Sequence, residues 1–153
     1  MLDIQADDVE RVARMVHELL RGSLDSGSPY GLQAYEDLPD HIKEANRQQV
    51  LRAPELLAAL GYRLERSDEA TERPAVQLTE AEIEEASVAE HEGWMRQKSA
   101  SGYRYGAVRD DSKRTHPSLV PWDQLPASVR ELDRQRVRLL PWIARELRLR
   151  AER

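Results

Sequence analysis

Apolar residues recur at helical spacing in two long segments of the chain. The first segment is followed by Gly22, which favours the end of a helix, and the second is preceded by Thr79 and Glu82 in the spacing of a capping box. The pattern predicts helices over about residues 6–21 and 80–99. The stripe positions are Val9, Val12, Ala13, Val16, Leu19 and Leu20 in the first segment, and Ile83, Ala86, Glu90 and Trp94 in the second.

Four prolines mark two further helices. Pro39 and Pro126 stand where a proline is tolerated in the first helical turn, so we expect a helix to start at each. Pro54 and Pro141 each follow fifteen residues later, where the ring should kink the helix or begin a new segment.

The proline pattern belongs to an internal repeat. Residues 35–60 align without gaps on residues 122–147, at an offset of 87, and His17-Glu18 and Tyr30-Gly31 precede the first copy as His91-Glu92 and Tyr105-Gly106 precede the second. We therefore expect one compact unit made of a first copy (1–65), a linker (66–78) and a second copy (79–153). The identical pairs are Leu38/Leu125, Pro39/Pro126, Glu44/Glu131, Arg47/Arg134, Gln48/Gln135, Val50/Val137, Pro54/Pro141 and Leu60/Leu147, and the conservative pairs include Asn46/Asp133.

Composition limits the class of protein. Hydrophobic residues make up 40% of the chain, without any Phe, so the core must consist mostly of Leu, Ala, Val and Ile. Since there is no Cys, disulfides and thiolate metal sites are excluded. A basic signal sequence and a long apolar run are both lacking, which favours a cytoplasmic protein without a membrane segment.

The charge distribution draws attention to one loop. A net charge of -5 argues against general nucleic-acid binding, yet residues 96–114 carry a positive excess. The second copy also contains a twelve-residue insertion at about residues 107–118, here called the strap. Long loops in compact domains are uncommon, so we favour a binding loop, with a balanced solvated loop as the alternative.

Motifs for catalysis and metal binding are weak. His91-Glu92 begins like a zinc-protease motif, but Met95 stands where the second histidine is required, so we expect no metal site. The histidine–glutamate pairs are instead predicted to support helix contacts or to fix a loop backbone. The phosphate-binding glycine pattern and the nucleophile elbow are absent, so we expect no enzyme. Trp94, Trp122 and Trp142 are predicted mainly as core anchors, with Trp122 also a candidate ligand contact.

Residues 90–141 resemble the RyR domain, a repeat named after ryanodine receptor calcium channels and also found in bacteria and phages. The first copy, about 9–63, looks like a degenerate version, and the pair is similar to the tail of some bacterial TrkA-type nucleotide-binding proteins. The matching residues are His91, Glu92, Trp94, Gly102, Tyr103, Tyr105, Gly106, Asp110, Lys113, His116, Pro117, Leu119, Pro121, Trp122, Leu125, Pro126, Asp133 and Arg134.

The resemblance implies a mainly α fold, with two helical hairpins related by a pseudo-twofold axis and short β-strands in the loops. It also implies a non-catalytic sensor of a nucleotide-derived or other phosphorylated small molecule in bacterial signalling or phage defence, without a cofactor. The alternative is a protein-interaction module that docks an effector or a TrkA-type domain. The oligomeric state stays open.

The predicted ligand site gathers around the strap. We expect aromatic rings to stack on a base, cations to meet phosphate, and His91 and Glu92 to orient the loop or read a polar edge. For Arg134, pairing with Asp110 or Glu92 is the alternative. The aromatic residues are Tyr103, Tyr105 and Trp122; the cations are Lys98, Arg109, Lys113 and Arg134; Trp94 and His116 complete the set.

Overall fold

The computed structural model describes residues 2–22, 29–69, 73–74 and 76–153, and it is mainly helical, as predicted. The α-helices are α1 (Ala6–Leu20), α2 (Asp40–Ala59), α3 (Glu80–Ala100), α4 (Ala127–Arg138) and α5 (Leu140–Glu146). Two 3₁₀ turns, η1 (Tyr35–Asp37) and η2 (Trp122–Gln124), precede α2 and α4. The strands are β1 (Arg63–Arg66), β2 (Arg104–Tyr105), β3 (Thr115–His116) and β4 (Leu149–Glu152).

The helix boundaries follow the predicted signals closely. The capping box at the start of α3 is formed in both directions, between the Thr79 side chain and the Glu82 backbone and the reverse. Pro39 and Pro126 are the residues just before α2 and α4, so each helix starts one residue later than expected. A new segment begins beside Pro141, where α4 gives way to α5, whereas Pro54 lies inside an unbroken α2.

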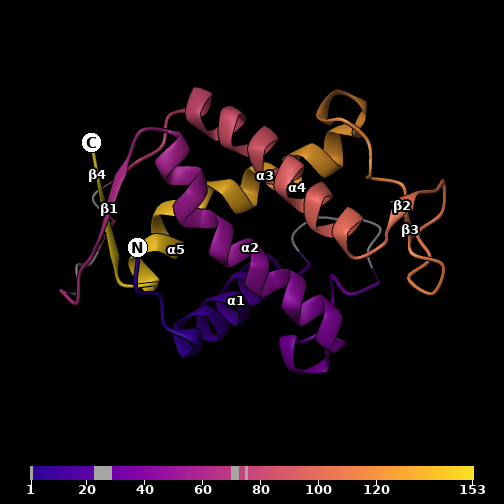
Figure 1. Ribbon diagram of the computed structural model, residues 1–153, viewed down its shortest axis with the longest axis horizontal. Helices are drawn as coiled ribbons and strands as arrows, with labels where there is room; N and C mark the ends of the chain where they lie inside the picture. The colour runs from indigo at the N-terminus through magenta and orange to yellow at the C-terminus, as the bar shows by residue number, and fades with distance from the viewer. Residues whose placement is uncertain (1, 23–28, 70–72, 75) are drawn as a thin grey trace.

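The helices pack in pairs around α2, which lies between α1 and α3 (Figure 1). α1 packs on α2, α3 packs on α4, and α5 closes the core against α2. The core is aliphatic, as the composition predicts, with Tyr35 as its buried ring. Its most buried members are Val12, Ala13, Tyr35, Val50, Ala53, Leu57, Val137 and Leu147.

Two small sheets lie on opposite sides of the helices (Figure 1). β1 and β4 are antiparallel, and their register places Leu64 opposite Ala151, which are equivalent positions at the repeat offset of 87. β2 pairs in parallel with β3 at the base of the strap, so short strands do form in a loop, as the resemblance implies. The pseudo-twofold relation of the whole copies stays a prediction.

Trp142 is not a core residue, so its prediction as a core anchor is wrong. It is 41% exposed, while its neighbours Pro141 and Ile143 are buried. The short helix α5 turns those neighbours inward, and the Trp142 ring faces outward beneath the guanidinium of Arg145. Within the described ranges, no helix has the length and apolar character that a membrane crossing needs.

Candidate functional site

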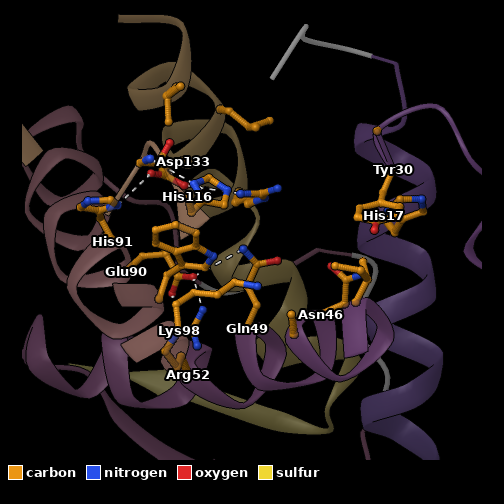
Figure 2. Close-up of a pocket in the computed structure, with 18 of the residues that line it drawn as sticks. His17, Tyr30, Asn46, Gln49, Arg52, Glu90, His91, Lys98, His116 and Asp133 are labelled. Carbon is orange, nitrogen blue, oxygen red and sulfur yellow. Dashed lines mark hydrogen bonds and ion pairs between the residues drawn. The ribbon is translucent and has the colours of Figure 1, made fainter. Parts of the chain in front are cut away.

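A cavity of about 200 Å³ lies between the two sequence-related halves of the chain. Figure 2 shows His17 and Tyr30 on one side of it, His91, His116 and Asp133 on the other, and Asn46, Gln49 and Arg52 along α2. Glu90, Trp94 and Lys98 reach it from α3, and Arg109 reaches it from the strap.

The helical walls of the cavity are matched position by position. Each residue that α4 contributes is the repeat equivalent of one from α2, at the offset of 87. His17 and His91 are likewise equivalent, at an offset of 74. The cavity therefore lies where the two copies present the same faces to each other. The pairs are Ile42/Val129, Ala45/Leu132, Asn46/Asp133 and Gln49/Arg136.

The two equivalent histidines fix loop backbone, as predicted for the histidine–glutamate pairs. His17 Nε2 donates to the carbonyl of Gln33 at 2.7 Å, and His91 Nε2 donates to the carbonyl of Val120 at the same distance. Each bond holds the segment that leads into a 3₁₀ turn. In the first copy, the Glu18 carboxylate also accepts the backbone N–H of Tyr35.

Buried acids lie beside arginines on the cavity floor. Arg52 contacts Glu90 through two bonds, Nη2 to Oε1 at 2.6 Å and Nε to Oε2 at 3.0 Å. Asp133 lies 3.5 Å from Arg136, and burial raises the pKa of its carboxyl above the ordinary value. These polar groups can read hydrogen-bonding edges of a bound molecule.

A cationic wall faces these groups. Lys98 is buried, with Nζ 4.6 Å from the centroid of the Tyr103 ring, and burial lowers the pKa of its amine. Burial also lowers the pKa of His116 to about 4, helped by the charges of Arg109 and Lys98. The His116 ring packs edge-on against Trp94.

The strap closes over the cavity through Asp111. Its carboxylate accepts the hydroxyl of Tyr30, from the first copy, at 2.9 Å and that of Tyr103 at 3.0 Å. Burial raises the pKa of Asp111, but the two tyrosine hydrogen bonds and the charge of Arg109 more than offset this, and the net pKa is lowered. Arg109 lies over the Tyr30 ring, 5.2 Å from its centroid.

Residues 75–140 match the family model of the RyR domain. This part of the chain is a RyR domain. The match covers α3, the strap, α4 and the first residue of α5, so most of the cavity's second wall belongs to the RyR domain. The first copy, with His17 and α2, lies outside the matched residues.

Five of the predicted site residues of the RyR domain line the cavity, namely His91, Trp94, Lys98, Arg109 and His116. Glu92, Tyr105 and Lys113 lie outside its walls on exposed surface, because α3, β2 and the strap, respectively, turn them outward. Tyr103 contacts the Lys98 amine through its ring, and its hydroxyl donates a hydrogen bond to Asp111.

Trp122 and Arg134 have structural contacts instead of lining the cavity. Arg134 pairs with Glu84 at 2.8 Å and lies over the buried Trp122 ring, so neither Asp110 nor Glu92 is its partner. The repeat-equivalent residues of the first copy also form an ion pair beside a buried ring, since Arg47 pairs with Glu10, whose carboxylate accepts the hydroxyl of Tyr35. The Trp122 ring therefore presents no open face to the cavity.

The cavity residues absent from the sequence prediction lie on helices. They were missed because the composition of the loops points to the strap. A single polar residue in a helix cannot be told, from the sequence, from a residue on the solvent-exposed face. The repeat alignment carried the signal, since Asn46 and Asp133 are aligned in it. The residues missed include Asn46, Gln49, Arg52, Glu90, Asp133 and Arg136.

Proposed function

We propose that this protein is a non-catalytic sensor that binds a nucleotide-derived or other phosphorylated small molecule in the cavity between its two halves. The observation that carries the proposal is the matched pair of walls from α2 and α4, closed on one side by the cationic strap. A molecule held there contacts both copies, so its binding free energy depends on how the copies lie relative to each other. This is the property that a sensor in bacterial signalling or phage defence requires.

The chemistry of the lining supports a ligand with a polar ring and an anionic group. Asn46 and Gln49 offer amide donors and acceptors, and Trp94 offers a ring surface. Asp133, with its raised pKa, can donate a hydrogen bond when it is protonated. Lys98 and Arg109 supply positive charge for phosphate.

Thermal unfolding with a panel of mono-, di- and cyclic nucleotides and ADP-ribose tests this function. A ligand at 100 times its Kd stabilises the folded state by about 2.7 kcal/mol. For a domain of this size, that raises Tm by roughly 5 to 10 °C. If no member of the panel raises Tm, the proposed function is wrong for these ligand classes.

A matched pair of variants separates cavity binding from surface binding. Ala45 lines the cavity, so Ala45→Phe places a ring inside it and should abolish the Tm increase. Ala58→Phe makes the same substitution on the exposed face of the same helix and should leave the increase unchanged. Equal loss in both variants, or in neither, would contradict binding in this cavity.

A second candidate is a protein-interaction module that docks an effector or a TrkA-type domain. One observation favours it, since the strap and its base expose two large side chains, Val108 at 74% and Tyr105 at 58%. In that case Val108→Ser and Tyr105→Ser would weaken binding to a TrkA-type domain in a titration, while Ala45→Phe would not.

A further inference from the structure

We propose that Lys98, Arg109 and His116 form a single oxyanion subsite, which takes a phosphomonoester group of the bound molecule and binds a proton at His116 as it fills. This inference rests on the proposed function and names the end of the cavity that receives the charged group. The three residues come from two elements, the last turn of α3 and the strap, and all line the same cavity.

The burial of Lys98 is the first observation. The residue is only 7% exposed, and among the described residues its amine has no hydrogen-bond or ion-pair partner. A buried ammonium group is costly unless an opposite charge accompanies it. The Tyr103 ring attracts the amine through its π face but carries no formal charge. An oxyanion beside Nζ would supply the opposite charge.

Arg109 adds a second positive charge to the same wall. Its Nε lies 3.6 Å from Asp111, but the oxygens of that carboxylate already accept the hydroxyls of Tyr30 and Tyr103. The lining also holds two acids, but Glu90 pairs with Arg52 and Asp133 pairs with Arg136. Lys98 and Arg109 together with Asp111 therefore add a positive charge on this side of the cavity.

His116 completes the subsite as a hydrogen-bond donor. Its Nδ1 accepts the backbone N–H of Ser118 at 3.0 Å, so the proton of the neutral ring is on Nε2. With a pKa of about 4, the ring is neutral at pH 7. An adjacent oxyanion favours the charged ring and so raises the pKa of His116. Anion binding is then coupled to protonation of His116, and it becomes tighter as the pH falls.

Several other charged or titratable groups act on His116 or line the same cavity. The charges of His91, Lys98, Arg109 and Asp111 act on it directly. Elsewhere in the lining are Glu90 from α3, Arg52 from α2, Asp133 and Arg136 from α4, and His17 and Tyr30 on the opposite side. Since Asp133 could also take up a proton, the test must isolate His116.

Sulfate is the probe, because it stays a dianion from pH 5 to 8 and its own titration does not contribute. Calorimetric titration of the full chain should show saturable binding. If the anion restores the ordinary His pKa near 6.5, sulfate binds about 20-fold tighter at pH 5 than at pH 7. His116→Gln, which keeps a donor, should remove most of this pH dependence.

Two lysines give a matched comparison. Lys98→Met should weaken sulfate binding at pH 6 by about 10- to 100-fold, the loss of one charge-assisted hydrogen bond. Lys113→Met removes an exposed lysine of the strap that lies outside the cavity and should change the affinity by less than about twofold. Because Lys98→Met removes a buried charge, Tm without sulfate should not fall, which confirms that the variant is folded.

The outcomes separate the subsite from the proposed function. No saturable sulfate binding, equal effects of the two lysine variants, or an unchanged pH dependence in His116→Gln would each overturn the subsite. Adenosine and AMP binding equally well would also overturn it while leaving the function intact. Sulfate binding as described, with no nucleotide bound, would support the subsite and overturn the proposed function for the nucleotide classes.

Discussion

The Arg52–Glu90 pair offers a direct test of how the two copies are held together. It joins α2 of the first copy to α3 of the second on the cavity floor. The Arg52 side chain is 12% exposed and the Glu90 side chain is 4% exposed. Substituting Arg52→Met keeps most of the apolar stem but removes the charge, both hydrogen bonds to Glu90 and a third, from Nη1 to Oε1 of Gln97.

The expected cost follows from the burial of the remaining carboxylate. After the substitution, the hydrogen bond that remains to the Glu90 side chain among the described residues is the 3.4 Å contact from Gln49. Breaking a buried ion pair by removing one partner costs about 3 to 5 kcal/mol, because the other charge stays buried and unpaired. For a chain of this size, that lowers Tm by roughly 6 to 20 °C. The double variant Arg52→Met/Glu90→Gln removes the unpaired charge and should recover most of the loss.

Urea unfolding of the wild type, both variants and one control measures this effect. The control is Arg150→Met, which breaks the Arg150–Glu152 pair of 2.8 Å, with side chains 51% and 39% exposed. An exposed pair contributes about 0 to 1 kcal/mol. If Arg52→Met costs no more than Arg150→Met at an unchanged m-value, or if the double variant recovers nothing, burial does not govern the pair.

Two further predictions concern the same interface. A Cβ at Gly93 would lie 2.7 Å from Cδ of Arg52, so Gly93→Ala should displace the Arg52 side chain. We expect the free energy of unfolding to fall by about 1 to 2 kcal/mol, despite a helix-propensity gain of about 1 kcal/mol. A Tm at or above the wild-type value would contradict this. Tyr30→Phe removes a hydrogen bond to Asp111 and should speed amide hydrogen exchange in the strap, at a cost of about 0.5 to 1.5 kcal/mol. Tyr62→Phe, remote from the strap, is the control, and equal exchange in the two variants would refute the docking role.

Much of the fold could be predicted from the sequence, because its signals are local. The capping box at Thr79, the stripe of α1 and the prolines before α2 and α4 each act within one or two helical turns. Pro54 was harder, because whether a proline ends a helix depends on packing around it, and here the residue is buried inside α2.

The site was predicted only in part, because it depends on which helix faces meet. Arg109 and His116 were predicted correctly as lining residues, because the strap that carries them has an unusual composition and length. Asn46 and Asp133 occupy helix positions whose orientation is decided by the packing of one copy on the other. Trp122 looked accessible beside a long loop, yet Arg134 and the core cover its ring.

The strap explains how a duplicated unit can acquire a directional binding site. The helical walls of the cavity are built from repeat-equivalent positions: Asn46 corresponds to Asp133, and Gln49 corresponds to Arg136. By themselves, these walls offer a ligand similar contacts in either of two opposite orientations. Only the second copy carries the twelve inserted residues, and these bring Arg109 and His116 to one side. Under the proposed function, the phosphate end of a ligand points to the strap and its ring lies toward Asn46. Deleting the strap should therefore abolish the preference for AMP over adenosine, whereas Asp133→Asn, which makes the matched pair identical, should preserve it.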